Sequence, residues 1–520
     1  MILVPLATKV ILLHAQVLTM NPAQPRATIV GVVDGKVAYV GDELPAAKKA
    51  VGGEPDSIID CGGHTLMPGL NDAHVHFGLQ LTLGSEHGVT LPDGAGQSRA
   101  GFRRAVLDAV IGQPGDHLLY ILTRDLPIGI NHATDLDFVT RPLFVVSSHG
   151  GLFNSAGFKL SGLGPEEAPN GFVRGRELAV ALDRLAKAQS LGQLLAGARA
   201  FLRRCAALGL TSVQLIDDFP DLFESLRRRG ELSLRVRFTP LGFRFDTRLY
   251  QPTWTAPAPE WVRLEGVKYF HDDGARLSRL ELRSIFDVHV PIGRQVLIHV
   301  LSRRALVSLL DTLEALVRAL PEGARARASR LFRLEHVDEL GPGDAERLAR
   351  LGIPVCSNPS MLPEWRHSLR DRAFPLRTLI DAKVRVCIGS DFVGVHTPVR
   401  PLDPWFAIGE AVNRTGPERI TVEEALGAYT AGSADAEGLL AEKGTLVAGK
   451  WADLVVVSTD PLSVAPTELH RTTTLLTMVG GKIVFRSPEL RDIPAHPGPS
   501  IGPAPSSLPS IGPERPTRRL

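Results

Sequence analysis

Two histidines in the stretch LNDAHVHFG, residues 70–78, are the first side chains whose type and spacing could hold a metal ion. Residues i and i+2 of a β-strand project from the same face, so His74 and His76 would present two imidazoles side by side. A half-buried strand with two incidental histidines explains this stretch equally well. Residues at the ends of other predicted strands are needed to distinguish these two interpretations.

Four further candidates lie in or directly after apolar, strand-like segments. They are Lys268 in GVKYF, His299 in QVLIHV, His336 in LFRLEHV and Asp391 at the end of VCIGSD. Each alone has an ordinary structural explanation: a hydrogen-bonded core histidine, a lysine in an ion pair, or an aspartate that caps a helix. Their shared position at strand ends favours a metal centre.

These residue types define a chemistry. Imidazole and carboxylate suit Zn²⁺ and related divalent ions. A second ion needs a bridging anion, and the amine of Lys268 would become one if CO₂ converted it to a carbamate. Two ions about 3.5–4 Å apart hold a hydroxide between them and lower its pKa towards about 7. Asp391 would bind one ion, accept the hydroxide proton and pass it to the leaving group.

The elements that must position these side chains alternate between strand and helix over residues 66–435. Apolar segments such as LTSVQLI and IPVCS alternate with helical stretches such as LLAGARAFLRRCAAL and RALVSLLDTLEALVRAL. Strand then helix, repeated over this length, predicts an α/β fold with a closed (β/α)8 TIM-like barrel. Barrel enzymes carry their chemistry at the C-terminal ends of the strands, where the candidates lie.

Both ends of the chain are β-rich. Residues 1–65 contain KVILLHAQVLTM and DGKVAYVGD, and residues 436–487 contain WADLVVVST and TTLLTMVGGKIVF. Neither piece alone would bury a core, so we expect them to form one small composite β-sandwich domain, with the barrel inserted between them. Residues 488–520 are rich in Pro, Gly and Ser and contain PSIGP twice, which predicts a disordered tail.

Composition narrows the function classes. The 520 residues are 44% hydrophobic and 22% charged with a formal net charge of +2, which gives no reason to expect nucleic acid or an acidic membrane surface as a partner. The four cysteines form no CxxC pair and fit a reducing compartment. The apolar N-terminus is interrupted by Lys9 and His14 and does not read as a signal peptide. We expect a cytoplasmic enzyme with a small-molecule substrate, no membrane span and a homodimer as the default assembly.

Up to about residue 486 the sequence resembles the amidohydrolase superfamily, and within it the YtcJ-like branch (amidohydrolase family 3) of metal-dependent hydrolases. MPGLNDAHVHFG resembles the family's entry motif PGφxDxHxH, where φ is apolar. The segments SSHGGLFNSAGFKLSGL, NGFVRGREL, LFRLEHV and IGSDFVGVHTPVRPLDPWFAI resemble later family segments, and ITVEEALGAYTAGSADAEGLLAEKGTLVAGKWADLVVVSTDPLS resembles the closing signature. This resemblance covers both the strand-like segments that carry the candidate metal ligands and the β-rich segment near the C-terminus.

The resemblance implies a role for each candidate. The assignments are His74 and His76 for the more buried ion, His299 and His336 for the second ion, Lys268 as a bridging carbamate, and Asp391 as ligand and general base. His149, in the SSHGG segment, is similar to a family position near the pocket mouth and is a substrate-contacting candidate. The implied cofactors are two divalent metal ions, with zinc expected.

The sequence departs from the family pattern at two places. KYFHDDG carries both Asp272 and Asp273, so either could take the family's aspartate position, and either could form an ion pair with Lys268. The usual IHAIGDRA reads IHVLSRRA here, with Ser302 and Arg303 in place of Gly-Asp. Substrate contacts at that strand end are therefore expected to differ.

Three functions are compatible with these residues. The first is a binuclear hydrolase of a C–N bond, of amide type. The second is a mononuclear deaminase of the same superfamily, which usually carries a glutamate shortly after the fifth-strand histidine, whereas HVLSRRALV has none. The third is an inactive scaffold, against which the presence of every expected ligand type counts. An N-acyl or N-formyl amine, a cyclic amide and an ester all remain compatible substrates.

Overall fold

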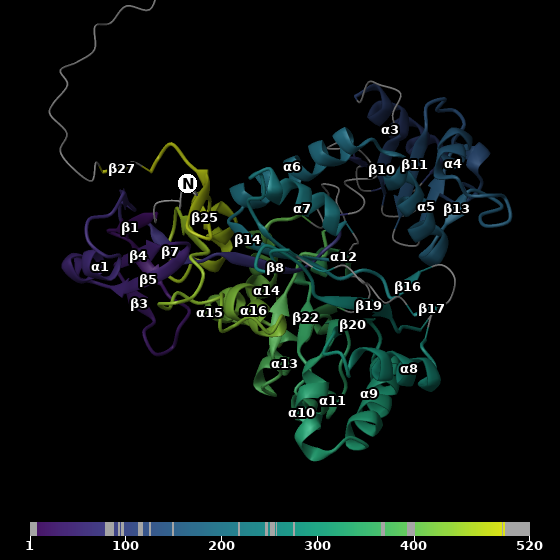
Figure 1. The fold of residues 1–520 in the computed structure, drawn as a ribbon. Helices are drawn as coiled ribbons and strands as arrows, with labels where there is room; N and C mark the ends of the chain where they lie inside the picture. Colours follow the sequence, from purple (N-terminus) through teal and green to yellow (C-terminus); the bar gives the residue numbers. More distant parts are fainter. Residues whose placement is uncertain are drawn as a thin grey trace, which may run out of the picture.

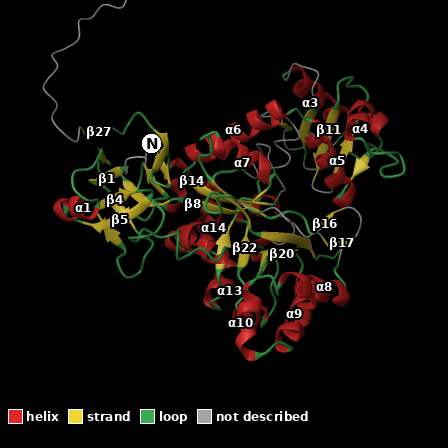
Figure 2. Cartoon of the chain, viewed as in Figure 1, coloured by secondary structure: helices red, strands yellow, loops and turns green. Residues whose placement is uncertain are grey.

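The computed structural model describes the chain in segments that cover most of its length. They are residues 8–77, 88–91, 94, 98–112, 118–123, 126–147, 150–216, 219–244, 248–249, 255, 257–273, 276–365, 370–392, 401–490 and 492–493. These residues form an α/β structure in which the helices surround several sheets (Figures 1 and 2). Within these segments, no helix combines the length and the apolar character needed to cross a membrane.

Two parallel sheets carry the candidate residues. The first has the order β18-β15-β14-β8 and consists of β8 (Leu70–Val75), β14 (Leu210–Leu215), β15 (Arg235–Phe238) and β18 (Val262–Leu264). The second has the order β19-β20-β21-β22-β23 and consists of β19 (Gly266–Phe270), β20 (Gln295–Val300), β21 (Phe332–His336), β22 (Val355–Ser357) and β23 (Val386–Ile388). Their apolar runs are buried, as expected for parallel strands covered on both faces.

The two parallel sheets meet through isolated bridges. Val75 at the end of β8 bridges Phe392, which lies just beyond β23, and Leu241 beyond β15 bridges Lys268 in β19. Glu265 alone separates β18 from β19. The predicted α/β class is confirmed, whereas the hydrogen-bonded ladders in the described residues form two sheets and not one closed sheet.

Helices follow the parallel strands, as the alternating sequence pattern predicted. The longer ones are α6 (Leu191–Ala207), α7 (Pro220–Arg228), α8 (Arg279–His289), α9 (Arg303–Arg318), α10 (Glu322–Arg330), α11 (Asp344–Leu351), α13 (Leu376–Asp381), α14 (Pro404–Asn413) and α15 (Val422–Gly427). Two short helices are α12 (Leu362–Trp365) and α16 (Ser433–Ala436). In α9, apolar side chains three and four positions apart are buried, and Ser302 caps the helix by accepting a hydrogen bond from the Ala305 backbone. Arg303 and Arg304 thus begin a partly exposed helix.

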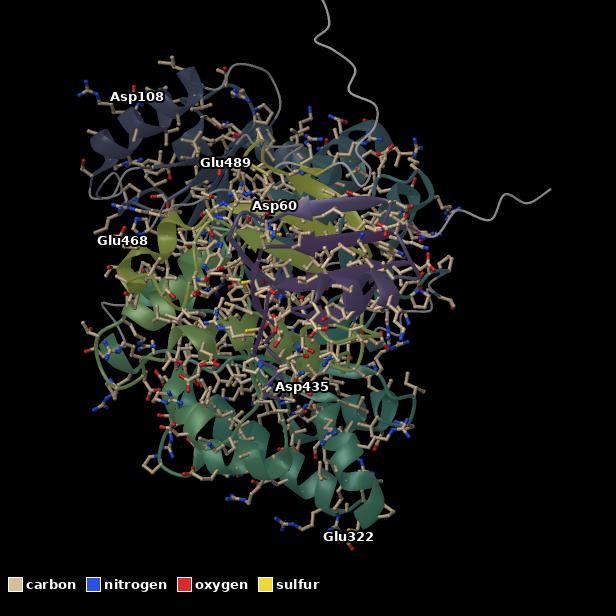
Figure 3. The ribbon with its side chains drawn as sticks, turned by 90° about the vertical axis from the view of Figure 1, so that its left-hand side faces the viewer. Asp60, Asp108, Glu322, Asp435, Glu468 and Glu489 are labelled. Carbon is tan, nitrogen blue, oxygen red and sulfur yellow. The ribbon has the colours of Figure 1, made fainter. Side chains whose placement is uncertain are left out.

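Strands from both ends of the chain combine in two further sheets. One has the order β27-β6-β1-β4-β5, with β1 (Lys9–Leu13), β4 (Ile29–Val33), β5 (Lys36–Gly41), β6 (Ser57–Asp60) and β27 (Asp492–Ile493). The other has the order β26-β25-β24-β7-β2-β3, with β2 (Gln16–Leu18), β3 (Arg26–Ala27), β7 (Thr65–Pro68), β24 (Leu454–Val457), β25 (Thr474–Val479) and β26 (Lys482–Arg486). Figure 3 shows the purple N-terminal strands beside the yellow C-terminal ones. One hydrophobic cluster joins both sheets, for example through Leu12 and Val456. Helix α1 (Leu44–Ala50) packs on β4 and β5.

A fifth sheet lies between β8 and β14 in the sequence, and the sequence analysis did not predict it. Its order is β13-β12-β11-β10-β9, with β9 (Gly88–Thr90), β10 (Leu119–Leu122), β11 (Leu143–Ser147), β12 (Gly150–Phe153) and β13 (Phe172–Val173). Helices α3 (Arg99–Ile111), α4 (Ser155–Ser161) and α5 (Gly175–Ala188) accompany it. This unit has hydrophobic clusters of its own and stands apart from the parallel sheets at the upper right of Figure 1.

The C-terminal strand corrects one predicted boundary. Leu490 is buried in the cluster between the two terminal sheets, and β27 pairs antiparallel with β6. The predicted disordered tail therefore begins too early at residue 488, because the short segment ELRDI precedes the Pro-rich composition that drove the prediction. Residues 494–520 lie outside the described part of the chain.

Truncation after Ser487 is accordingly expected to destabilise the protein. It removes β27 and the buried Leu490 side chain, whose burial alone contributes about 1.5–3 kcal/mol to the free energy of unfolding. Thermal unfolding followed by circular dichroism should show a lower Tm than for a matched chain truncated after Ile493, which keeps these contacts. Equal Tm values for the two truncated chains would contradict the packing described here.

Candidate metal centre

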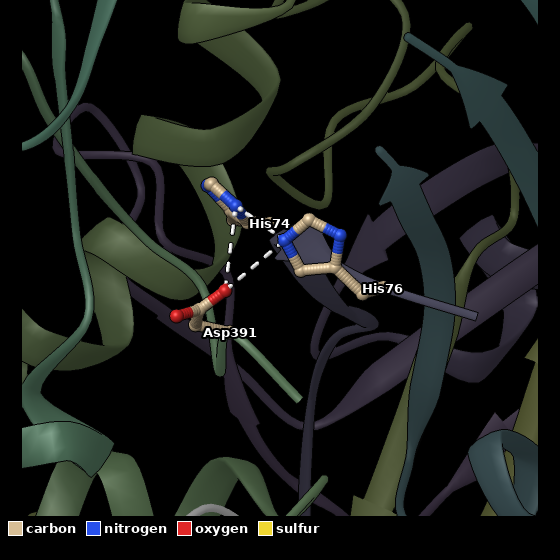
Figure 4. A group of neighbouring side chains, drawn as sticks. All are labelled: His74, His76 and Asp391. Atoms are coloured by element: carbon tan, nitrogen blue, oxygen red, sulfur yellow. Dashed lines mark hydrogen bonds and ion pairs between the residues drawn. The ribbon is translucent and has the colours of Figure 1, made fainter. Parts of the chain in front are cut away.

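Three side-chain atoms from β8 and the segment after β23 form a compact triangle (Figure 4). His74 Nε2 lies 3.3 Å from His76 Nε2, and Asp391 Oδ1 lies 3.5 Å from the former and 3.3 Å from the latter. A tetrahedral zinc ion with ligands at about 2.0–2.1 Å places its ligand atoms about 3.3–3.4 Å apart. The triangle therefore has the dimensions of three ligands around one ion.

The protonation state of His74 bears on whether the triangle could hold a cation. Burial and the charge of Lys268 lower the pKa of His74 to about 4, so its imidazole is neutral near pH 7. Its Nδ1 lies 2.6 Å from Glu335 Oε2, and the single ring proton belongs in that hydrogen bond. The lone pair of Nε2 then faces the Asp391 carboxylate. Two electron-rich atoms 3.5 Å apart in a buried site repel each other unless a cation lies between them.

His336 and His299 continue this cluster along β21 and β20. The His336 ring centroid lies 5.1 Å from that of His74 and 4.5 Å from that of His299. Burial, the largest cause, holds the pKa of both His336 and His299 below the usual range, so both are neutral near pH 7. The buried His336 Nδ1 has no hydrogen-bond partner among the described residues. Neutral imidazoles with a free lone pair are the form that binds metal ions.

Lys268 is buried within β19, among these histidines. Burial lowers the pKa of its amine to about 8, although the charges of Glu335 and Asp391 oppose this shift. Its own charge in turn lowers the pKa of His74 and His299. The amine is therefore neutral more often than that of an exposed lysine at the same pH.

The two adjacent aspartates after β19 have different surroundings. Asp273 Oδ1 accepts hydrogen bonds from Arg276 (2.7 Å) and Arg304 (2.9 Å). Asp272 Oδ2 instead lies 3.9 Å from His299 Nε2, so Asp272 is the aspartate beside the candidate site. Among the described residues, neither forms an ion pair with Lys268. An ion pair with Asp272 or Asp273 is therefore not supported as the explanation for the buried Lys268.

Local backbone contacts hold the ligand positions together. Asp72 Oδ1 accepts hydrogen bonds from the backbone of Ser390 (2.9 Å) and of His74 (3.2 Å), and the Asp391 backbone donates to the His74 carbonyl (2.9 Å). A Cβ at Gly389 would lie 2.5 Å from the His74 backbone nitrogen, so only glycine allows this close approach.

Two candidate ligands also have strained backbones. The φ angles of His336 and Asp391 are 73° and 51°, in the left-handed region that non-glycine residues rarely adopt. Such strain costs about 1–3 kcal/mol per residue and persists only where the surrounding structure over-determines it. Val337 adds a β-branched residue with a φ of 53° directly after His336. The concentration of strain at these positions is typical of a functional site.

The structure thus brings His74, His76, Asp391, His336, His299 and Lys268 into one neighbourhood, whereas His149 lies outside the described residues. Sequence reasoning missed three buried polar residues there: Asp72, Arg333 and Glu335. The last two offered a signal. They alternate with Leu334 in an otherwise apolar strand, so both charges point to one buried face.

Buried imidazoles, a carboxylate and a low-pKa lysine at the ends of parallel strands are typical of a metal-dependent hydrolase. The sequence profile of the amidohydrolase family matches residues 57–485, and the chain belongs to this family. This confirms the resemblance drawn from the motifs, including its YtcJ-like branch. Membership supports a hydrolase that uses a divalent metal ion and acts on C–N bonds of small molecules.

Two related sequences and one solved structure are consistent with membership of the amidohydrolase family. An N-substituted formamide deformylase from Arthrobacter pascens is 26% identical over an alignment of 550 residues, which covers 91% of this chain and 98% of that protein. The putative amidohydrolase YtcJ of Bacillus subtilis is 29% identical over 212 residues, covering 37% of this chain and 38% of its own. The crystal structure of a metal-dependent hydrolase from Pyrococcus horikoshii has a TM-score of 0.68 at 20% identity, and the match covers 88% of this chain and 99% of that one. At 20% sequence identity, this structural similarity shows a shared fold and no more.

Proposed function

We propose that this protein hydrolyses the amide bond of an N-acyl amine with two divalent metal ions, zinc being the expected metal, and that N-substituted formamides are the first substrate class to test. The observation that carries this proposal is the His74–His76–Asp391 triangle, in which a lone pair and a carboxylate face each other at 3.5 Å. The substrate class is supported by the formamide deformylase, whose similarity extends over nearly all of both chains.

The proposed architecture is an eight-stranded parallel barrel. Counting β18 and β19 as one strand, the two parallel sheets supply eight strands, and the bridges Val75–Phe392 and Leu241–Lys268 lie where the sheets would close. In such a barrel the strand C-termini share one rim, which accounts for the meeting of residues from β8, β19, β20, β21 and the segment after β23. The terminal sheets would form the β-sandwich domain, with residues up to Ile493 included.

The donors divide naturally between two ions. His74, His76 and Asp391 would hold the first, and His299 and His336 the second. Lys268 would bridge them as a carbamate. The neutral amine attacks CO₂, a new N–C bond forms and one N–H proton is released, leaving the negative charge that two cations require. The lowered pKa of Lys268 supports this step, because only the neutral amine has the lone pair that reacts.

Asp391 would act as the general base. Divalent ions, when bound, supply Lewis acidity that lowers the pKa of water towards about 7 and polarises the substrate carbonyl. The Asp391 carboxylate would take a proton from the attacking water and deliver it to the leaving nitrogen, which departs as an amine. His76, whose side chain is 29% exposed beside the more buried His74, marks the side from which substrate would approach.

Metal analysis tests the proposed centre directly. We expect about two divalent ions per chain in protein purified without chelators, as a two-metal mechanism requires. Elemental analysis by mass spectrometry gives this ratio. Zinc-replete protein is then assayed against a panel of matched N-substituted formamides, acetamides, lactams and esters. A ratio that stays near one, with ammonia released from amino heterocycles, would favour the deaminase alternative.

A further inference from the structure

We infer that Arg333 and Glu335 form a positioning pair for His74, which fixes the proton on Nδ1 and turns Nε2 towards the metal. This inference rests on the proposed metal centre and assigns a role to two residues outside it. The pair contacts no substrate, so its expected effect is on metal affinity.

The hydrogen bonds of Glu335 carry the inference. Glu335 accepts from His74 Nδ1 at 2.6 Å, from Arg333 Nε at 2.6 Å and from Arg333 Nη2 at 3.2 Å. All three side chains are fully buried. With both carboxylate oxygens engaged by the guanidinium, Glu335 has one geometry in which to meet the imidazole, and the His74 ring is held in one orientation.

Arg333 is itself held by the opposite sheet. Its Nη2 donates to the carbonyl of Ala73, directly before His74, at 2.9 Å. Its Nη1 donates to the side-chain oxygen of Gln214 on β14, and Gln214 Nε2 donates to Thr239 Oγ1 at 2.8 Å. A chain of buried hydrogen bonds therefore runs from β21 to β14 and β8, and it ends at the imidazole that carries the metal-facing lone pair.

A second interpretation is that Glu335 is a metal ligand. His74, Glu335 and Cys356 do offer buried donor atoms within 4.8 Å of one another. However, the 2.6 Å between His74 Nδ1 and Glu335 Oε2 is a hydrogen-bond distance, shorter than the roughly 3.3–3.6 Å that separates two atoms bound to one tetrahedral ion at about 2.0–2.2 Å. Glu335 therefore serves as hydrogen-bond acceptor to His74.

Stability alone does not account for this pair. Burying two charges costs desolvation, and apolar residues of similar volume in place of a buried ion pair often leave stability unchanged or raise it. The chain offers a matched comparison in Arg235 and Asp453, another buried pair with two hydrogen bonds, at 2.6 and 2.9 Å. That pair joins β15 to the residue just before β24, and in the described part of the chain no histidine is among its hydrogen-bond partners.

The experiment compares zinc affinity with thermal stability in full-length protein. Wild type, Glu335→Gln, the double variant Arg333→Met/Glu335→Leu and the control Asp453→Asn are equilibrated in buffers of fixed free Zn²⁺, and bound zinc is measured. A His74→Ala variant identifies which of the bound ions depends on His74. We expect affinity for that ion to fall about 10- to 100-fold in Glu335→Gln and in the double variant. Asp453→Asn should lower Tm and leave zinc affinity unchanged.

The double variant separates positioning from folding, because it removes both charges of the pair together and leaves neither of them buried alone. We expect it to keep the wild-type Tm without zinc while still binding zinc weakly. Wild-type zinc affinity in Glu335→Gln or in the double variant would overturn the inference, and so would loss of the folded state in both. Wild-type protein that binds no zinc in these buffers would instead refute the proposed metal centre.

Discussion

Asp391→Asn is expected to fold normally and to lose at least about 10²- to 10⁴-fold in kcat for amide hydrolysis, the contribution typical of a general acid–base group. Asparagine keeps the size of the side chain but accepts no proton at neutral pH. It also tolerates the positive φ of 51° at this position better than most residues. The backbone hydrogen bond from residue 391 to the His74 carbonyl is retained. The variant thus removes the proposed base and keeps the backbone hydrogen bond that holds residue 391 in position.

The measurement is kcat on the best substrate of the panel with zinc-replete enzyme, together with Tm. Asp273→Asn is a suitable control, because Asp273 lies near the same region but binds Arg276 and Arg304 at the surface. It should retain wild-type kcat. Hydrolysis at the wild-type rate by folded, zinc-replete Asp391→Asn enzyme would remove Asp391 as the base.

Lys268→Ala is expected to reduce hydrolysis to near background and to lower the zinc content by about one ion per chain, since two cations held close together need an anionic bridge. The substitution leaves a cavity where the buried side chain lay. A small carboxylate such as acetate or propionate, added in excess, should enter it and supply the missing negative charge. We therefore expect dose-dependent recovery of both activity and bound zinc.

Two comparisons make this second test specific. Lys268→Met fills the cavity, so carboxylates should not restore its activity. In the wild type, metal- and CO₂-depleted enzyme should regain activity faster at pH 8 than at pH 6 when zinc is added and the concentration of dissolved CO₂, the species that the amine attacks, is kept equal at the two pH values. The reason is that the neutral amine of Lys268 becomes more abundant as the pH rises towards its pKa of about 8. Full activity of Lys268→Met would show that no carbamate is needed.

The sequence was most informative where strands are buried on both faces. GVKYF and QVLIHV are apolar runs apart from one or two polar residues, and Lys268 and His299 stood out for that reason, whereas FRLEH carries three polar residues among five. Glu335 lies in the same strand as His336, and the sequence analysis did not assign it to the site. Its role depends on contact with His74 on β8, which lies in the other parallel sheet, and no local pattern reports that contact.

The inserted sheet β9–β13 was harder to foresee. Several of its strands are short, β13 has only two residues, and the Gly150-Gly151 pair at the start of β12 reads as a loop. Phe144 and Phe153 stack inside this unit with ring centroids 3.9 Å apart, and a sequence pattern alone does not distinguish a core phenylalanine from one that lines a pocket. Strand β27 escaped prediction for a similar reason, since its two residues border a Pro-rich segment.

The pairing of β7 with β24 has a consequence for the order of synthesis. Gly69 alone separates β7 from β8, the strand that carries His74, and β7 pairs with β24 from Thr65 with Val457 to Pro68 with Leu454. A nascent chain that has just released residue 391 from the ribosome already holds all six proposed donors and β2, which pairs with β7 on one side, but β24, the partner of β7 on the other side, does not yet exist. Strand β7 is flanked on both sides only after Leu454–Val457 have emerged, so the sheet that anchors the start of β8 should be completed later than the set of proposed donors.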